Sequence, residues 1–246
     1  MSSAYEPEAT ETPAPIITPT PKPTEIPKVE NVPKIENIPK VSDVPKIEII
    51  TEIENVPEPT IRPEFTALME QFNNQDIVGY LRIPNTSIDY PVLQSDDNEY
   101  YLHKNIYGQT IKSGSIFLDY ENDILKDDYN MILYGHNMKE RVMFHDLRNY
   151  QSKSYWENHR YITFNTLYED MTWEIFSFYE THVSFYYYQA VFSDSAEFFK
   201  LAEKMKAKSM YDTGVTISPD DRVLTLSTCT NVHGDTRFVV NAKLVR

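Results

Sequence analysis

The sequence has few cysteines, few glycines and no long apolar run. A single cysteine among 246 residues excludes an internal disulfide framework. Six scattered glycines are too few for a glycine-rich phosphate-binding loop. No apolar stretch approaches the roughly 20 residues of a membrane-spanning helix, and no signal-peptide core is visible. The chain is therefore neither a disulfide-stapled scaffold nor a phosphate-loop nucleotide-binding protein.

Positive charge is scarce as well. The chain has 23 lysines and arginines against 37 acidic residues, which gives a formal net charge of −14 at pH 7. Proteins that bind nucleic acids need clustered basic residues to neutralise phosphates, so we expect no nucleic-acid partner. The six histidines show no metal-ligand spacing with a cysteine or a carboxylate, so we expect no metal site and no cofactor.

Proline is abundant only toward the N-terminus. Residues 1–63 hold 13 of the 16 prolines and none of the glycines, and from Pro27 to Pro45 a proline recurs every six residues. Proline fixes φ and biases the preceding residue away from the helical region, so no helix extends through such a repeat. We therefore expect residues 1–63 to form a proline-rich stalk or linker that is extended or disordered. A periodic ligand for a partner protein is the alternative interpretation.

Residues 64–246 have the length and composition of one globular domain. Glu64 to Gln75 carries apolar residues at the spacing of one helix face, which predicts a short helix: Phe65, Leu68, Met69 and Phe72. Asp194 to Met205 predicts a second helix, because Asp194 and Glu197 stand at capping-box spacing. Its apolar face comprises Phe198, Leu201, Ala202 and Met205.

The rest of the domain consists of short β-rich runs broken by turn residues. The runs are VGYLRI, IDYPVLQ, GSIFLDY, YNMILYGHN, RYITFNT, MTWEIFSFYE, VSFYYYQAVF, DRVLTLSTC and RFVVNAKLV. The last one, residues 237–245, alternates in a way that is typical of a half-buried strand. Many short strands at this spacing indicate a β-barrel or a β-sandwich.

Three residues suited to covalent catalysis stand at the ends of strand-like runs. Cys229 closes one run, Arg237 opens the next, and His136 follows the apolar run MILY within a turn-like GHN. A nearby imidazolium or arginine favours the thiolate, and an imidazole also serves the acid–base steps. If the three strands are neighbours, these residues converge at one end of a sheet. The alternative is an inert structural thiol, because free cysteine is among the most buried residue types.

Recognisable segments follow one another along the domain. In order, IVGYLRIPNTSIDYPVLQSDDNEYYLHKNIYG, SGSIFLDY, YGHNM, TLSTC and RFVV resemble the sortase family and, within it, class B. The similarity spans residues 74–246. It implies a mainly β fold, a closed eight-stranded barrel with an N-terminal helix. It also implies a long helix between the sixth and seventh strands, which residues 194–205 match.

The resemblance also implies roles for individual residues. Cys229 corresponds to the nucleophile, His136 to the general acid and base, and Arg237 to a clamp for the oxyanion or the substrate. Three further positions correspond to substrate-binding residues: Ser227, Thr228 and Asn137. The chain departs from many class B members after the cysteine, where it has threonine and asparagine instead of an acidic residue and an aromatic one.

The implied activity is that of a cysteine transpeptidase. Such an enzyme cleaves the C-terminal sorting motif of a surface protein after threonine and forms a thioacyl-enzyme. It then joins the acyl group to an amine of peptidoglycan or lipid II. The resemblance places it on the outer face of the membrane, within a Gram-positive cell wall, with an N-terminal membrane anchor outside this sequence.

Two other classes of protein compete with this interpretation. A papain-type protease has its cysteine early and its histidine late, which is the reverse of the order here. A non-catalytic wall-binding or adhesion module would use the proline repeat as its functional part, and it predicts an inert Cys229.

Overall fold

The computed structural model describes residues 59–229 and 234–245, with Cys229 described through its backbone only. These residues belong to one compact unit, Val56–Arg246. Most of the predicted stalk, residues 1–58, lies outside the described residues. Arg62, which we assigned to the stalk, donates its backbone N–H to the Leu167 carbonyl at 3.0 Å. Its guanidinium also pairs with Asp170 at 2.8 Å, so this residue contacts the domain.

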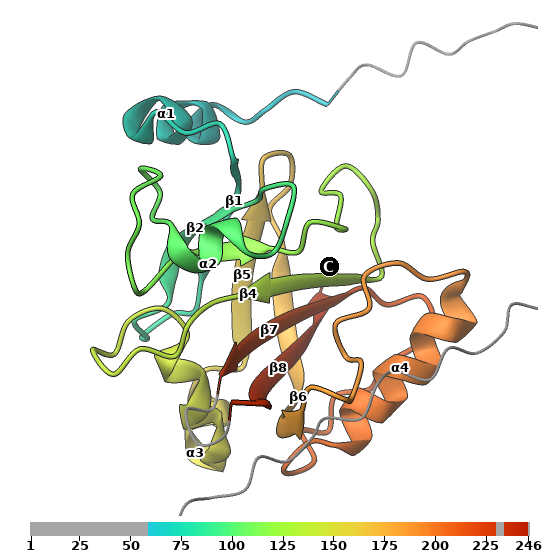
Figure 1. The fold of residues 1–246 in the computed structure, drawn as a ribbon. Coiled ribbons are helices and arrows are strands. Elements are labelled where there is room, and N and C mark those ends of the chain that lie inside the picture. Colours follow the sequence, from blue (N-terminus) through green and yellow to red (C-terminus); the bar gives the residue numbers. More distant parts are fainter. Residues whose placement is uncertain (1–58, 230–233, 246) are drawn as a thin grey trace, which may run out of the picture. The chain divides into compact units, whose positions relative to one another are not determined.

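Eight strands close into a barrel in the order β1-β2-β3-β4-β7-β8-β6-β5 (Figure 1). The strands are β1 (Ile77–Arg82), β2 (Asp89–Leu93), β3 (Ile116–Leu118), β4 (Asn130–Tyr134), β5 (Tyr161–Thr166), β6 (Thr172–His182), β7 (Val223–Cys229) and β8 (Thr236–Val245). Two neighbouring pairs, β2 with β3 and β4 with β7, are parallel, and the other pairs are antiparallel. The predicted closed eight-stranded barrel is confirmed.

Apolar side chains from every strand fill the barrel interior. Representative members, one from each strand, are Leu81, Val92, Leu118, Leu133, Phe164, Phe178, Leu226 and Phe238. Because strand side chains alternate between the two faces, one set of apolar positions per strand is enough to build this core.

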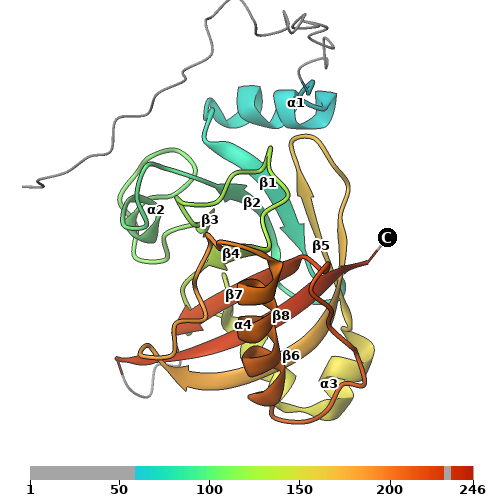
Figure 2. The same ribbon diagram turned by 90° about the vertical axis from the view of Figure 1, so that its right-hand side faces the viewer.

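The outer face of β8 is buried as well, which corrects the prediction of a half-buried strand. Val239 points away from the barrel interior, yet it is fully buried in a second apolar cluster. That cluster includes Phe198 and Ala202 of helix α4 (Ser195–Ala207). Figure 2 shows α4 lying across β6, β7 and β8. The helix therefore covers a face that we had expected to meet solvent.

The two predicted helices are confirmed, with small changes at their ends. The first, α1 (Pro63–Phe72), ends before Gln75 because Asn73 adopts a left-handed conformation with φ of 48°. Its predicted apolar face packs with α2 (Tyr100–His103) in a third cluster. Asp194 caps α4 by accepting the Glu197 backbone N–H at 2.8 Å. Two short helices, η2 (His145–Gln151) and α3 (Lys153–Asn158), lie between β4 and β5 in the chain.

The run VSFYYYQAVF, residues 183–192, is not a strand, so that prediction is wrong. Strand β6 ends at His182, and the chain then turns before α4. The aromatic residues of this segment pack rather than pair: Tyr187 is buried among residues beneath α4, whereas Tyr186 is exposed. Among the described residues, no helix is both long enough and apolar enough to span a membrane.

Candidate active site

The three predicted catalytic residues meet at one edge of the barrel. Parallel strands β4 and β7 pair Tyr134 with Ser227, so His136 and Cys229 each follow two residues later at the same end. Antiparallel strands β7 and β8 pair Cys229 directly with Arg237. The adjacency that the sequence left open is thus present in the backbone of the barrel. The side chain of Cys229 lies outside the described part of the chain.

His136 sits on a short loop that is fixed from both sides. The backbone N–H of Gly135 donates to the Ser227 carbonyl at 3.3 Å, and the N–H of Phe144 donates to the His136 carbonyl at 3.0 Å. A side chain at Gly135 has no room, because a Cβ would lie 2.9 Å from the Phe144 ring and would collide with Ile116. The glycine therefore lets the loop close against the barrel core.

One nitrogen of the His136 ring is already engaged. Its Nε2 lies 2.9 Å from the backbone carbonyl oxygen of Leu102, in α2. A carbonyl only accepts hydrogen bonds, so Nε2 carries a proton in this arrangement. The other nitrogen, Nδ1, is then the one that can exchange a proton with a reacting group. This backbone contact was invisible in the sequence, because any residue at position 102 supplies the same carbonyl.

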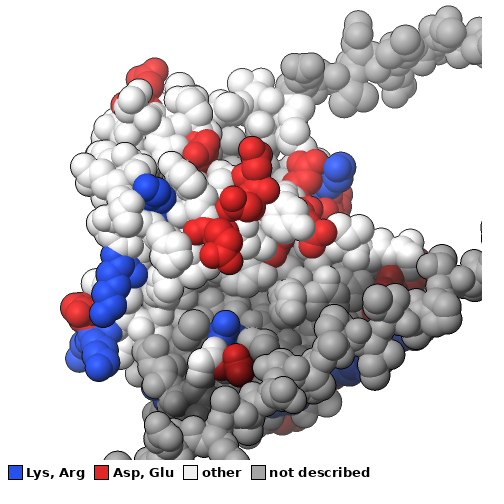
Figure 3. Space-filling view, in the orientation of Figure 1, with Lys and Arg blue, Asp and Glu red and all other residues white. Residues whose placement is uncertain are grey.

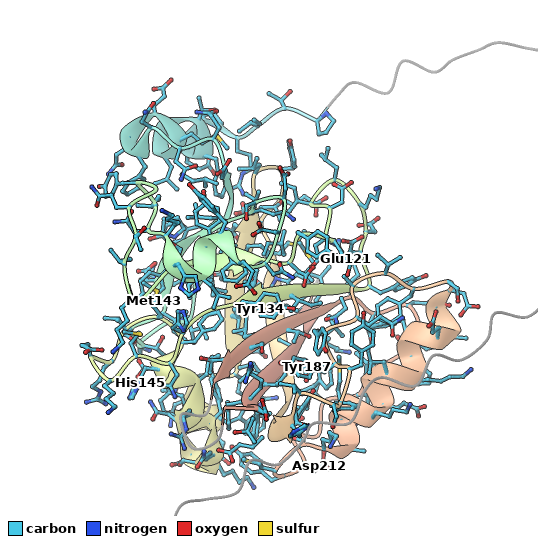
Figure 4. The ribbon with its side chains drawn as sticks, in the orientation of Figure 1. Glu121, Tyr134, Met143, His145, Tyr187 and Asp212 are labelled. Atoms are coloured by element: carbon cyan, nitrogen blue, oxygen red, sulfur yellow. The ribbon has the colours of Figure 1, made fainter. Side chains whose placement is uncertain are left out.

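His136, Leu102 and Arg237 border a cavity of about 380 Å³. Residues of β3, β4, β7 and β8, together with the two residues that follow β4, form one side, here called the strand wall: Phe117, Tyr134, Gly135, His136, Ser227, Thr228 and Arg237. Connecting segments form the other side, here called the loop wall: Asn98, Glu99, Leu102, Val183, Tyr187 and Tyr188. In Figure 4, Tyr134 lies near the end of β4 and Tyr187 near β7.

Arg237 is held close to the turn between β7 and β8. Its Nη1 donates to the carbonyls of Gly234 at 2.8 Å and Thr236 at 3.1 Å. A surface ion pair with an acid such as Asp235 would be the simplest structural role for this arginine. No salt bridge joins Arg237 to any residue that the structure describes. Its charge is therefore available at the cavity rim.

The two hydroxyls before the cysteine have different surroundings. The Ser227 Oγ lies 2.7 Å from the Tyr187 hydroxyl, which joins the strand wall to the loop wall. The Thr228 Oγ1 is buried and has no hydrogen-bond partner within residues 59–229 and 234–245. Burying a hydroxyl without a hydrogen-bond partner is unfavourable, and Thr228 also lines the cavity.

Asn137 is not part of the cavity lining, unlike the other predicted substrate-binding residues. It is buried, and its Oδ1 lies 3.0 Å from the His145 Nδ1. Asn137 also forms a β-bridge with Met143, which closes the loop that carries His136. These contacts support the loop that carries His136, and the role of Asn137 in substrate binding stays a prediction.

The loop wall was missed by sequence reasoning. The segment that carries Tyr187 is tied to the barrel by Asn130, whose Nδ2 donates to the carbonyls of Tyr187 at 3.2 Å and Gln189 at 2.9 Å. The Asn130 Oδ1 accepts from Thr225 at 2.7 Å, and Thr225 accepts from Asn241 at 2.8 Å. All three of these barrel residues are fully buried. The only sign of this network in the sequence was the presence of three polar residues within the predicted strands, Asn130, Thr225 and Asn241.

Acidic side chains gather across the middle of the face shown in Figure 3. Glu99 is exposed and lines the cavity, and further exposed acids stand in the connections that follow β2 and β3: Asp96, Asp97 and Glu121. Within the described ranges, no group of three His, Cys, Asp or Glu side chains is placed to hold a metal ion. Such a surface favours cationic partners over anionic ones.

Comparisons with known proteins agree with this geometry. Residues 81–245 match the family described as the sortase domain. The chain belongs to the sortase family. Sortase B of Listeria monocytogenes is 42% identical over 174 residues, which cover 70% of this chain and 71% of that protein. Sortase B of Staphylococcus aureus is 34% identical over 188 residues, 76% of each chain.

Solved sortase B structures share the fold. The Bacillus anthracis enzyme in complex with AAEK1 is 40% identical, with a TM-score of 0.70 over 77% of this chain and 88% of that one. The Staphylococcus aureus sortase B–substrate complex is 34% identical, with a TM-score of 0.71 over 76% of this chain and 86% of that one. This sortase is therefore of the B type, a cysteine transpeptidase.

Proposed function

We propose that this sortase cleaves the sorting motif of a surface protein after threonine and transfers the acyl group to a peptidoglycan or lipid II amine. The observation that carries the proposal is the strand register. It aligns His136 with Cys229 across a parallel pair and Arg237 with Cys229 across an antiparallel pair. Further support comes from a relative with the same fold, the Staphylococcus aureus sortase B, whose structure was solved as a sortase B–substrate complex.

The acylation step uses the three residues in distinct roles. The Cys229 thiolate attacks the threonine carbonyl carbon, and negative charge develops on the carbonyl oxygen. Arg237 stabilises that charge, an effect worth about 2.7–4 kcal/mol in comparable oxyanion sites. The peptide C–N bond then breaks, and the leaving amine takes a proton from the His136 Nδ1. A thioester between Cys229 and the threonine acyl group remains.

Deacylation reverses the proton flow. An incoming amine attacks the thioester carbonyl, gives its proton to His136, and displaces the Cys229 thiolate as the new amide forms. An amine is protonated at neutral pH, so exposed acids such as Glu99 at the cavity favour its approach, and it loses that extra proton to solvent before the free amine attacks. Without an amine, water takes its place, and we expect slow hydrolysis.

Product analysis with a library of sorting peptides tests this function. With an added amine, the wild-type domain should release the peptide downstream of threonine and join the upstream part to the amine. Without the amine, the same peptide should be hydrolysed more slowly. Cleavage at another residue, or products that are identical with and without the amine, would contradict the proposal.

We also propose that residues 1–63 serve as a spacer and that the catalytic domain follows them. The spacer would hold the domain away from a membrane anchor on the outer face of the cell, inside the wall. Its proline-rich composition offers too little apolar surface to join a core. Removing residues 1–58 should leave peptide turnover and melting temperature unchanged. A deletion through Pro63 should lower the melting temperature slightly, because it also removes the Arg62–Asp170 pair.

A further inference from the structure

Asp119 is a buried acidic residue that the reaction does not use. It follows β3 directly, its exposed fraction is only 2%, and it does not line the cavity. Burying a carboxyl group is unfavourable unless its oxygens accept hydrogen bonds. The groups that supply those bonds show what the residue holds in place.

Both walls of the cavity donate to this carboxyl group. Its Oδ2 accepts from the Tyr134 hydroxyl at 2.8 Å, on the strand wall, and from the Asn98 Nδ2 at 2.9 Å, on the loop wall. Its Oδ1 accepts the backbone N–H of Glu121 at 3.0 Å. One side chain thus connects two residues that face the cavity from different segments.

The same network fixes how the two cavity residues present their polar atoms. The Asn98 Oδ1 accepts the backbone N–H of Tyr120 at 3.1 Å, so the nitrogen and oxygen of that amide are both assigned by their partners. Burial, together with the neighbouring Asp119, raises the pKa of Tyr134, so its hydroxyl remains a donor to the carboxyl oxygen. Asn98 cannot turn without losing its hydrogen bonds to Asp119 and to the Tyr120 backbone, and Tyr134 cannot turn without losing its hydrogen bond to Asp119.

An ionised carboxylate is the side chain that suits this position. All three partners of Asp119 donate, and a carboxylate accepts at both oxygens. Asparagine has the same shape, but its NH₂ group would face at least one of these donors. The substitution Asp119→Asn therefore breaks the network while preserving the volume of the side chain.

We propose that Asp119 is a positioning residue that sets Asn98 and Tyr134 relative to each other, and that it thereby determines how tightly the peptide substrate binds. This inference rests on the proposed function, because it takes the cavity as the binding site of the sorting peptide. Asp119 does not contact the reacting atoms. Its effect should consequently appear in KM rather than in the reactivity of the cysteine.

A matched control lies in the same connection between β3 and β4. The Asp128 Oδ2 accepts from the Asn122 Nδ2 at 2.9 Å and from the Asp123 backbone N–H at 2.8 Å. None of these three residues lines the cavity. Asp128→Asn therefore breaks the same kind of network without touching either wall, and it reports the effect of lost stability alone.

The test uses the peptide that the wild-type enzyme cleaves best. Asp119→Asn should raise KM about tenfold with kcat changed less than about threefold, while Asp128→Asn leaves KM within about twofold of wild type. The rate at which iodoacetamide alkylates Cys229 should match wild type in both variants. Equal KM values for the two variants, or slower alkylation in Asp119→Asn, would overturn the inference.

A double variant separates positioning from a general structural role. If Asp119 acts through Asn98, then adding Asp119→Asn to Asn98→Ala should raise KM little beyond Asn98→Ala alone. If the double variant instead raises KM by the product of the two single effects, the inference is overturned. Should Asp119→Asn fail to fold, Tyr134→Phe removes one bond of the network and should still raise KM several-fold; an unchanged KM would count against the inference. A wild-type enzyme that cleaves no sorting peptide would instead overturn the proposed function, and this inference with it.

Discussion

The strand wall and the loop wall of the cavity differ in what holds their residues in place. Backbone pairing aligns the strand wall: Tyr134 is opposite Ser227, and Cys229 is opposite Arg237. Buried polar side chains hold the loop wall, with Asp119 bound to Asn98 and Asn130 bound to the carbonyls of residues 187 and 189. The proposed reacting groups thus stand at strand ends or within two residues of one, whereas the proposed recognition surface of the loop wall depends on a few hydrogen bonds.

Replacing Cys229 or His136, the two residues proposed to exchange bonds and protons with the substrate, should have the largest effect. Cys229→Ala and His136→Ala should each lower kcat/KM by about 10³-fold or more, because each removes a group that the chemistry needs. The melting temperature of His136→Ala should change little, since this residue is only half-buried. A Cys229→Ala variant that retains more than a few per cent of wild-type turnover would rule out the mechanism.

Arg237→Lys should come next, with kcat/KM about 10²-fold lower. Lysine keeps the charge but lacks the fixed fork of the guanidinium. Alkylation of Cys229 by iodoacetamide should continue at the wild-type rate, because that reagent needs the thiolate and no oxyanion clamp. Parallel loss of alkylation and turnover would assign Arg237 to thiolate activation instead, and two unchanged rates would remove it from the site.

A change to the support of the loop wall should have a smaller effect. Asn130→Ala should raise KM several-fold and lower the free energy of unfolding by about 2 kcal/mol, because it leaves buried polar groups unpaired. Thr213→Val is the control: it removes a buried hydroxyl that donates to the Phe176 carbonyl at 2.9 Å, away from the cavity. The control should lose stability and keep its KM. If Asn130→Ala and Thr213→Val have equal KM values, Asn130 does not position the loop wall.

The smallest effect is expected at Glu197, at the start of α4. Its carboxylate accepts from the Ser193 backbone N–H at 2.8 Å and from the Gln189 Nε2 at 3.0 Å. These bonds, the backbone one foremost, lower its pKa from 4.5 to about 2. A lowered carboxyl pKa stabilises the fold above the unfolded value, and this stabilisation disappears as the pH falls toward the folded value.

Thermal unfolding of Glu197→Gln measured across pH tests this expectation. The melting temperature should lie slightly below wild type at pH 7, and the gap should close between about pH 4.5 and 2. Turnover at pH 7 should stay within about twofold of wild type, because Glu197 does not line the cavity. A gap that persists unchanged to pH 2 would show that the carboxylate charge is not responsible.

Periodicity along the chain accounts for much of the fold but not for what covers it. Helical spacing located α1 and α4, and most of the β-rich runs are strands. The outer face of β8 was assigned to solvent because the helix that buries Val239 lies well before it in the chain. Residues 183–192 were assigned to a strand because buried loops and strands share an aromatic, apolar composition, and long-range bonds from Asn130 decide between them.

In the candidate site, too, the sequence predicted some residues and missed others. Strand-end positions in the sequence predicted His136 and Arg237 at the cavity. Asn137 does not line this cavity, and its contacts with His145 and Met143, which the sequence did not show, support the loop that carries His136; its role in substrate binding stays a prediction. Loop-wall residues such as Asn98 gave no signal, since their places depend on partners distant in the chain.

Intact-mass measurement tests the central claim most directly. The domain is incubated with the library of sorting peptides and no amine, and the product is then digested to locate any added mass. We expect an adduct on Cys229 with the mass of the peptide up to and including threonine, and this adduct should be lost on addition of an amine and missing in Cys229→Ala. An adduct on another residue, or wild-type cleavage without an adduct that Cys229→Ala performs equally well, would contradict it.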